Sequence, residues 1–192
     1  RHLSSLACWA THAVVPEQSC VLIPGELPMD VASIIGCAVT TGVGAALNKA
    51  KVLPGSSVVV YGAGGVGMSV VMGSKLAGAD KIIVVDISES KKDLAQSFGA
   101  THFVLSENGA LDEIKSITDG LGADYSFEAV GNTNLETQLI DTIRPGGTAV
   151  MIGFPASGEN FLVNPAEIIR DEKVLTGSIY GTAHTMRDFV KY

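Results

Sequence analysis

The stretch SVVVYGAGGVGMSVVMGSKLAGADKIIVVD, residues 57–86, decides the fold. A run of β-branched residues typical of a buried strand leads into a glycine-rich turn, a helical pattern and a second apolar run that ends in a carboxylate. Gly62, Gly64 and Gly67 fit the spacing G-x-G-x-x-G. The first glycine permits a tight turn, the second lets a pyrophosphate approach the backbone, and the third lets the helix lie close to the strand. The stretch therefore predicts a strand–helix–strand unit that binds a dinucleotide.

The carboxylate at the end of this stretch indicates which dinucleotide is favoured. Asp86 lies nineteen residues after Gly67, where it can accept hydrogen bonds from both hydroxyls of an adenosine ribose. A 2′-phosphate would meet like charge there, so NAD is favoured over NADP. Backbone amides near Gly65 and Val66, at the helix N-terminus, would bind the phosphates. Two plainer interpretations stay open: a glycine-rich turn without a ligand, and Asp86 as a solvated strand end or helix N-cap.

Composition narrows the class of protein. The 192 residues are 46% hydrophobic, enough for a substantial core. The net charge of −7 comes without a basic stripe, which argues against nucleic acid and anionic membrane surfaces as partners. Residues 52–74 carry no charge over a length that could span a bilayer, but they include Pro54 and many glycines, so we interpret them as buried parallel-sheet core and expect no membrane span.

The cysteines and the start of the chain bear on its setting. Cys8, Cys20 and Cys37 are odd in number and show no C-x-x-C spacing, so neither a disulfide framework nor a self-contained zinc knuckle is expected. A reducing cytoplasm fits this pattern. The chain opens at Arg1 in the middle of a pattern, which indicates a piece of a longer protein.

Strands alternate with helices after the glycine turn, but not before it. Before residue 57 we predict two strands of a different domain at residues 9–15 and 21–23, a short helix from Pro28 to about Ile35 that Gly36-Cys37 breaks, and a second helix at residues 39–51. After Asp86 we predict strands at residues 102–105, 125–129, 148–152 and 174–179. We predict helices at residues 91–97, 111–118 and 165–170, a helix that carries Leu135, Leu139 and Ile143, and another that starts at Tyr180. A turn is predicted at residues 144–147.

This pattern specifies an α/β fold, a doubly wound six-stranded parallel sheet (Rossmann) in the order 3-2-1-4-5-6. In such sheets a ligand binds across the carboxyl ends of the strands, where the strand order reverses. The segments that follow the fourth, fifth and sixth strands should therefore meet the nicotinamide half of the cofactor.

One segment cannot be derived from a dinucleotide fold, and it carries a resemblance. GCAVTTGVGAA, starting at Gly36, is followed in order by VVVYGAGGVG, IIVVD, FEAVGN and GSIYG. This ordered set resembles the zinc-dependent medium-chain alcohol dehydrogenases over nearly the whole chain. The resemblance implies a remnant of a mainly β catalytic domain at residues 1–37, the NAD-binding domain at 38–180, and the start of a return to the catalytic domain at 181–192.

The resemblance also implies roles for particular residues. Cys37 would be a ligand of a catalytic zinc, and zinc would assist hydride transfer from an alcohol to NAD. From the residues alone, Cys37 is better explained as a small buried apolar residue than as a metal ligand. The other implied contacts with the cofactor come from Thr41 at the nicotinamide, Lys91 at the adenosine ribose, the backbone of Val66, Ala129 on the rim, and the backbones of Ile152 and Tyr180 at the carboxamide.

The resemblance has gaps that limit what this chain can do. In this family the other catalytic-zinc ligands lie upstream, and neither a G-H-E segment nor a four-cysteine lobe occurs here. The fragment is therefore expected to be inactive, although its parent would act on a small alcohol or aldehyde. Two alternatives stay open: a zinc-free reductase of the same superfamily, and a non-catalytic NAD-sensing module. The apolar edge strand at residues 174–179 predicts a homodimer.

Overall fold

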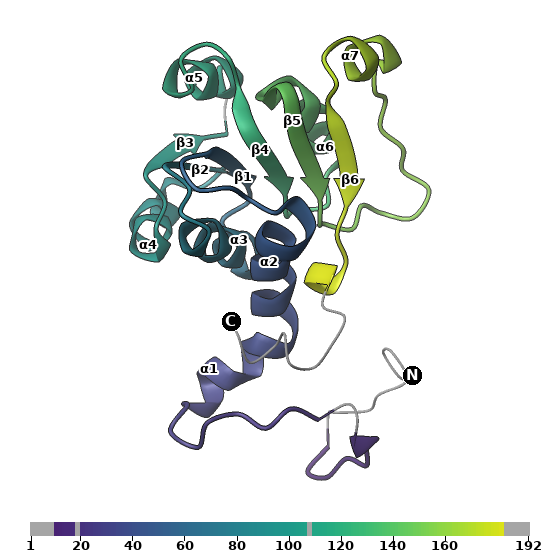
Figure 1. Cartoon of the computed structure of the whole chain (residues 1–192). Helices are drawn as coiled ribbons and strands as arrows, with labels where there is room; N and C mark the ends of the chain where they lie inside the picture. Colours follow the sequence, from purple (N-terminus) through teal and green to yellow (C-terminus); the bar gives the residue numbers. More distant parts are fainter. Residues whose placement is uncertain (1–9, 18–19, 107–108, 183–192) are drawn as a thin grey trace.

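A six-stranded parallel sheet forms the centre of the molecule. The computed structural model describes residues 10–17, 20–106 and 109–182 (Figure 1). The strands run in the order β3-β2-β1-β4-β5-β6, which confirms the predicted topology. Their bounds are β1 Ser57–Tyr61, β2 Lys81–Asp86, β3 His102–Leu105, β4 Ala123–Glu128, β5 Ile143–Met151 and β6 Val174–Gly177.

Strand β1 lies at the middle of the sheet because its side chains are apolar on both faces. Val59 pairs with Ile83 of β2 on one side and with Ser126 of β4 on the other. Alternate residues of β1 supply two separate cores, since successive side chains of a strand point to opposite faces. Val58 and Val60 pack in the first core, whereas Val59 and Tyr61 pack in the second. All four are buried, as expected for a parallel strand covered on both sides.

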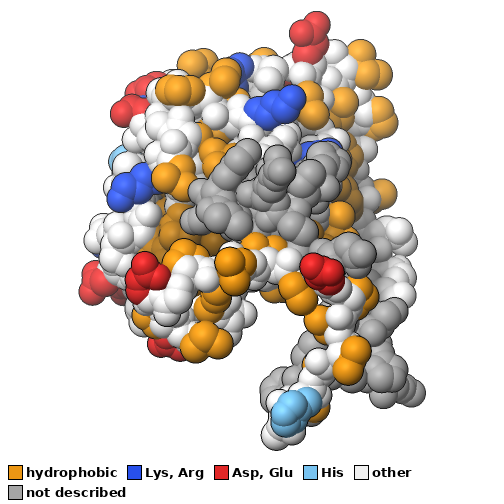
Figure 2. Space-filling model, turned by 60° about the horizontal axis from the view of Figure 1, so that its bottom comes forward, with side chains coloured by type: hydrophobic (Ala, Val, Ile, Leu, Met, Phe, Trp, Pro, Cys, Tyr) orange, Lys and Arg blue, Asp and Glu red, His pale blue; other side chains and the backbone are white. Residues whose placement is uncertain are grey.

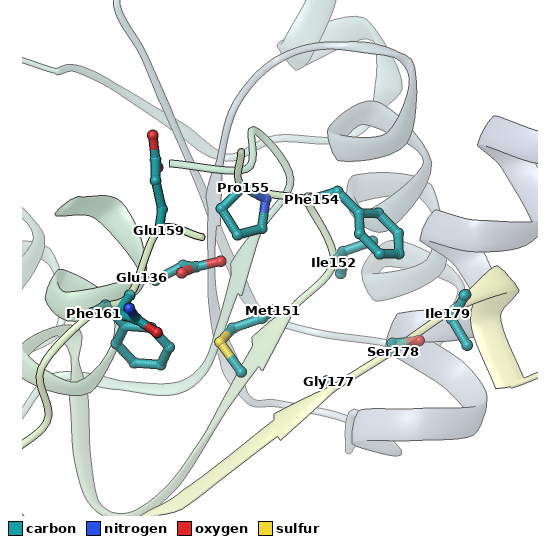
Figure 3. A pocket seen from close by; sticks show the side chains of 12 residues that line it. Glu136, Met151, Ile152, Phe154, Pro155, Glu159, Phe161, Gly177, Ser178 and Ile179 are labelled. Atoms are coloured by element: carbon teal, nitrogen blue, oxygen red, sulfur yellow. The ribbon is translucent and has the colours of Figure 1, made fainter. Parts of the chain in front are cut away.

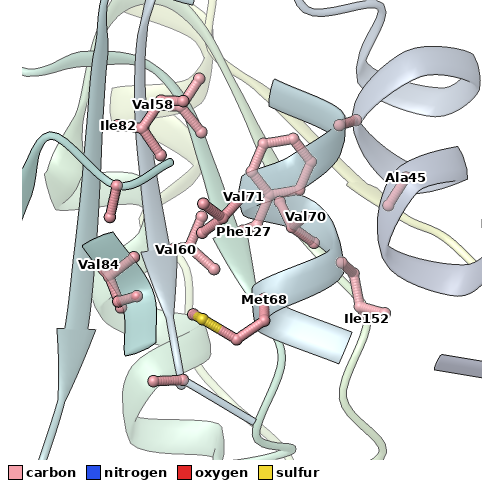
Figure 4. Packing of buried hydrophobic residues seen from close by; sticks show 14 of the residues in the cluster. Ala45, Val58, Val60, Met68, Val70, Val71, Ile82, Val84, Phe127 and Ile152 are labelled. Carbon is pink, nitrogen blue, oxygen red and sulfur yellow. The ribbon is translucent and has the colours of Figure 1, made fainter. Parts of the chain in front are cut away.

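Helices cover both faces of the sheet. The first core contains Met68, Val70 and Val71 of α3 Gly65–Leu76 and Ala95 of α4 Lys92–Phe98; Figure 4 shows the α3 side chains against Val60 and Phe127. The opposite core contains side chains of α5 Ala110–Ile117 and α6 Thr133–Thr142. The N-cap of α7 Pro165–Arg170 is Asn164, whose side chain accepts a hydrogen bond from the amide of Ala166. The sheet and its helices match the predicted alternation.

A single long helix precedes the sheet and corrects one prediction. It runs without interruption through α1 Met29–Ile34, a π-helical turn Ile35–Val39, α2 Thr40–Gly44 and a second π-helical turn Ala45–Ala50. Gly36-Cys37 therefore does not break it. One glycine weakens a helix by about 1 kcal/mol but removes no backbone donor. The hydroxyl of Thr40 also donates to the carbonyl of Ile35 across the widened turn, at 2.7 Å.

The long helix changes character along its length. No residue of α1 is buried, and the first buried residue of the long helix is Val39. Within the described residues, one helix, Met29–Ala50, is long and apolar enough by length and composition to cross a membrane, and 44% of its most apolar stretch is buried. Figure 1 shows the N-terminal half projecting from the body of the protein, and Figure 2 shows hydrophobic side chains around this end. Met29 and Ile34 are among the exposed ones.

The two strands predicted near the N-terminus are not formed. Residues 10–17 and 20–28 contain no strand, and Val14 and Leu22 are almost fully exposed. An apolar run forms a stable strand only when it pairs with a sheet, and no described strand lies beside this segment. Trp9, at the start of the first predicted strand, lies outside the described residues.

Strand β5 begins earlier than predicted. Ile143 pairs with Ala123, so it belongs to the strand, and α6 ends at Thr142. The predicted turn at residues 144–147 is a bulge within β5, because the next pair along the ladder joins Thr148 to Tyr125. Strand β6 is shorter than predicted, because it ends at Gly177. Residues Tyr180–Thr182 then form a 3₁₀ turn. The continuation of the helix predicted from Tyr180 lies outside the described residues.

Candidate functional site

The three glycines of the G-x-G-x-x-G motif after β1 differ in what surrounds them. Gly62 has a positive φ of 98°, and a Cβ there would lie 2.6 Å from Val130 Cγ2. At Gly67 a Cβ would overlap the carbonyl oxygen of Gly62, so the helix lies as close to the turn as predicted. Gly64 is different: its φ of −85° suits any residue, and a Cβ would project into open space. Internal packing therefore explains Gly62 and Gly67, whereas Gly64 keeps the surface in front of the turn clear.

Asp86 is held against the same turn. Its Oδ2 accepts a hydrogen bond from the amide of Ala63 at 2.7 Å, and its Oδ1 accepts one from the amide of Ser88 at 3.0 Å. Each carboxylate oxygen has a second lone pair, so the group can still accept from a ligand. It lines a cavity of about 410 Å³. The wall of this cavity is made by Tyr61, Gly62, Val85, Asp86, Ile87, Ser106, Val130, Asn132, Asn134 and Leu135.

Lys91 lies farther along the chain, in the 3₁₀ turn Glu89–Lys91, and is exposed. It is not among the residues that line the cavity beside Asp86. Its predicted contact with the ribose therefore stays a prediction.

A second cavity, of about 480 Å³, brings together most of the other predicted residues. The long helix, α3 and the segments that follow β4, β5 and β6 all contribute to it, although they are far apart in sequence. The predicted residues that line it are Cys37, Thr41, Val66, Ala129, Ile152 and Tyr180, and they are joined by Gly153, Phe154, Ser178 and Ile179. The carboxyl ends of the parallel strands thus form one rim, as expected for this topology.

Glycine contacts explain why the long helix reaches this rim. A Cβ on Gly42 would lie 2.5 Å from Ser69 Cβ and 2.7 Å from the amide of Val70, both in α3. A Cβ on Gly73 would in turn lie 2.9 Å from the Cα of Val43. The two helices therefore touch backbone to backbone. This contact supplies a structural reason for the TTGVG segment that the dinucleotide motif alone could not provide.

The turn after β6 is fixed on the same helix. The side chain of Asn48 donates to the carbonyl of Gly181 at 3.1 Å, and a Cβ on Gly44 would overlap that carbonyl. Tyr180 has a positive φ of 46°, an uncommon conformation for a residue with a side chain. Its position beside the cavity is therefore set by packing of the next residue on the long helix.

A third cavity, of about 570 Å³, adjoins the second along residues 152–154 and 178–179. Figure 3 shows Glu136 of α6 between Glu159 and Met151 at this cavity. Burial of its side chain, with the nearby charges of Glu128 and Glu159, raises the pKa of Glu136 above its ordinary value. Sequence reasoning missed both Glu128 and Glu136. The one available indication was a carboxylate at the end of an otherwise buried strand, in FEAVG.

The described residues fit a dinucleotide better than they fit a complete metal site. Gly64 leaves open space in front of the α3 N-terminus, and Asp86 faces a cavity beside it. In the described part of the chain, no group of three or more His, Cys, Asp and Glu side chains could hold a metal ion. Cys37 is exposed and is the one cysteine on the second cavity. A zinc held there would need further ligands from outside the described residues.

Comparison with known proteins gives a consistent result. The family model described as "Zinc-binding dehydrogenase" matches residues 65–192. S-(hydroxymethyl)glutathione dehydrogenase of Saccharomyces cerevisiae is 37% identical over 187 residues, and the match covers 94% of this chain and 48% of the relative. Alcohol dehydrogenase class-3 of Pisum sativum is 37% identical over 184 residues, with the same two coverages.

A solved structure agrees with these relatives. Benzyl alcohol dehydrogenase from Acinetobacter calcoaceticus superposes with a TM-score of 0.88 at 32% identity, over 93% of this chain and 49% of that one. The chain thus spans about half the length of the relatives that it matches. Since the family model covers well over half of the chain and the fold superposes closely, the chain belongs to the zinc-binding dehydrogenase family.

Proposed function

We propose that this chain is the NAD-binding part of a zinc-dependent alcohol dehydrogenase, whose parent protein transfers a hydride between an alcohol and NAD. The observation that carries the proposal is the convergence of six predicted site residues on the second cavity, together with the separate cavity that Asp86 lines. NAD, when bound, supplies the hydride acceptor. Relatives named S-(hydroxymethyl)glutathione dehydrogenase and alcohol dehydrogenase class-3 support an alcohol or aldehyde as the substrate class.

The chain's own residues would bind and orient the cofactor. Asp86 would accept hydrogen bonds from the adenosine ribose through its remaining lone pairs, with Lys91 reaching the same ribose. The clear surface at Gly64 and the amides of Gly65 and Val66 would receive the pyrophosphate, since the first amides of a helix have no partner within it. The nicotinamide half would lie in the second cavity, where four of the predicted residues would contact it: Thr41, Ala129, Ile152 and Tyr180.

Cys37 would supply one ligand of the catalytic zinc. A thiolate suits a metal that must keep one position open for substrate, but a catalytic zinc takes three protein ligands. The proposal therefore requires the other ligands to come from the rest of the parent protein. On this basis the 192-residue chain should bind NAD and show no alcohol dehydrogenase activity. The free thiols of Cys20 and Cys37 fit a reducing compartment such as the cytoplasm.

The proposed domain organisation follows the change in burial along the long helix. Residues 1–37 would belong with the catalytic domain, residues 38–180 with the NAD-binding domain, and residues 181–192 with the return to the catalytic domain. The first boundary falls inside a continuous helix, but close to where burial begins at Val39. Exposed apolar side chains such as Met29 and Ile34 would then pack on the rest of the parent.

We also propose a homodimer formed through β6. In the described part of the sheet β6 pairs only with β5, and Val174 on it is 48% exposed. An unpaired edge strand with apolar side chains readily pairs with another copy of itself. Light scattering of the purified chain should give twice the monomer mass, and Val174→Asp should shift it toward monomer. Leu76→Asp, an exposed substitution on α3, is the matched control; a monomer mass for the unaltered chain would refute the dimer.

The first test of the cofactor proposal is calorimetric titration of the chain with NAD and with NADP. The unaltered chain should bind NAD and discriminate against NADP. Asp86→Asn keeps an acceptor for the amide of Ala63 but removes the charge, so it should weaken NAD by about tenfold and narrow the NAD/NADP ratio. Asp80→Asn, an exposed residue just before β2, should change neither affinity. No heat with either nucleotide, or equal binding by Asp86→Asn, would contradict the proposal.

A further inference from the structure

Glu128 is a fully buried acid whose partners are backbone amides. It ends β4, and its Oε1 accepts hydrogen bonds from the amide of Val130 at 2.7 Å and from that of Gly131 at 2.7 Å. The amide of Asn132 lies at 3.4 Å from the same oxygen. Three successive amides thus point at one carboxylate oxygen, in the way that a backbone nest receives an anion.

The loop that Glu128 holds separates the two proposed halves of the cofactor site. Ala129 lines the second cavity, whereas Val130 and Asn132 line the cavity beside Asp86. Val130 also packs against Gly62, where a Cβ would lie 2.6 Å from Val130 Cγ2. A shift of this loop would therefore change the shape of both cavities and its contact with the glycine turn.

Glu128 also joins this loop to the neighbouring strand end. Its main-chain carbonyl accepts from the amides of Ile152 at 2.9 Å and Gly153 at 3.1 Å. A Cβ on Gly153 would lie 2.7 Å from Glu128 Oε2, and a Cβ on Gly131 would overlap the backbone of Phe154. The two loops after β4 and β5 thus pack on each other around this one side chain.

An acid at this position needs a reason beyond packing. Burying a carboxylate costs several kcal/mol unless hydrogen bonds compensate, and a valine or isoleucine would fill the end of a strand without that cost. Oε2 has no hydrogen-bond partner among the described atoms, so the compensation comes through Oε1. The side chain is therefore explained by the loop amides that it organises.

We propose that Glu128 is a positioning residue, which holds residues 129–132 in the conformation that shapes both halves of the cofactor site. This inference rests on the proposed NAD-binding function. Glu128 would not touch the cofactor; it would act through Ala129, Val130 and Asn132. Its Oε1 is an internal acceptor for the loop amides, so these amides are oriented before any ligand arrives.

Three variants separate positioning from folding. Glu128→Gln retains an oxygen at the same distance along the side chain, whereas Glu128→Asp is one methylene too short to reach all three amides. Ser126→Ala is the matched control, because Ser126 is equally buried on β4 and donates to the carbonyl of Leu139 at 3.1 Å, away from the loop. Each purified chain is titrated calorimetrically with NAD and with AMP, and backbone amide exchange is measured without ligand.

Glu128→Asp should weaken NAD by about 10- to 100-fold, as expected for the loss of one or two ordering hydrogen bonds. It should also speed exchange at Val130 and Gly131. Glu128→Gln should stay within about threefold of the unaltered chain in both measurements. Ser126→Ala should lower thermal stability without changing NAD affinity or exchange in the loop. AMP should follow NAD, because Val130 and Asn132 lie on the adenosine side.

The two measurements keep the two proposals distinct. Failure of the unaltered chain to bind NAD would overturn the proposed function. Unprotected amides at Val130 and Gly131 in the unaltered chain would overturn the assignment of Glu128, even if NAD binds. Wild-type affinity and exchange in Glu128→Asp would overturn it as well.

Discussion

Asp86 and Glu128 are carboxylates at the ends of the two strands that flank β1, yet they are used in opposite ways. Asp86 is partly exposed beside a cavity and accepts from the amides of Ala63 and Ser88. Glu128 is completely buried and gives one oxygen to three successive amides. Asp86 is placed where it can accept hydrogen bonds from a ligand, whereas Glu128 accepts them from the protein's own backbone. The difference teaches that position at a strand end does not define a role; the surroundings of the side chain do.

The largest effect on stability is expected when each of these two carboxylates is replaced by alanine. Glu128→Ala leaves buried amides without an acceptor and should lower the free energy of unfolding by about 2–4 kcal/mol. Asp86→Ala should lower it by about 1 kcal/mol, because water can reach its partners. Urea denaturation of both variants measures the difference. A larger loss for Asp86→Ala than for Glu128→Ala would reverse the assignment.

Two glycines of the G-x-G-x-x-G motif after β1 allow the same comparison between a residue needed for packing and a residue that faces the proposed ligand. Gly67→Ala forces a Cβ onto the carbonyl of Gly62 and should cost about 1–3 kcal/mol of stability. Gly64→Ala points a methyl group into open space and should change stability by no more than about 0.5 kcal/mol. It should nevertheless weaken NAD, because the methyl group occupies the surface proposed for the pyrophosphate. Thermal melts and calorimetry on the same samples check both halves; unchanged NAD affinity in Gly64→Ala would contradict the proposed site.

Asp124 is a third carboxylate, and its expected role is to stabilise the fold. Burial alone would raise its pKa, but hydrogen bonds from Ser57 and the guanidinium of Arg144 outweigh this and lower the pKa below its ordinary value. The stability that it adds is therefore present above the ordinary aspartate pKa and is lost as the pH falls through the lowered value. Asp124→Asn should cost about 1 kcal/mol at neutral pH and reduce the acid-dependent loss. Melts between pH 7 and pH 3 measure this, with exposed Asp112→Asn as the control.

Glu136 should have the smallest effect on stability, and its pH dependence should be opposite to that of Asp124. Its pKa is raised by burial and by the charges of Glu128 and Glu159. Between the ordinary and the raised pKa, the folded chain therefore binds more protons than the unfolded chain. Stability should fall as the pH rises from the ordinary glutamate pKa through the raised value. Glu136→Gln should remove that fall and give a slightly higher melting temperature at neutral pH. Glu113→Gln, exposed on α5, should do neither; a lower melting temperature for Glu136→Gln would contradict the sign.

The predictable part of this protein lies where local pattern and global fold agree. The alternation of β-branched runs, glycine turns and helices was sufficient for the sheet order, because parallel strands joined by right-handed crossovers allow few arrangements. The failures lie where tertiary contacts override a local pattern. Gly36-Cys37 does not stop the long helix, which continues onto α3 through Gly42. Residues 10–17 lack the sheet that would make them a strand.

The candidate site divides in the same way. The sequence by itself determined the glycine turn, the position of Asp86 at a strand end and the order of the strands, because spacing along one chain fixes these features. Only the tertiary structure decided that Cys37, Thr41 and Tyr180 share a cavity and that Glu128 turns inward to hold a loop. Those facts depend on how helices and strand ends approach one another in space, and that approach is set by backbone contacts at glycines and by burial, neither of which a one-dimensional pattern records.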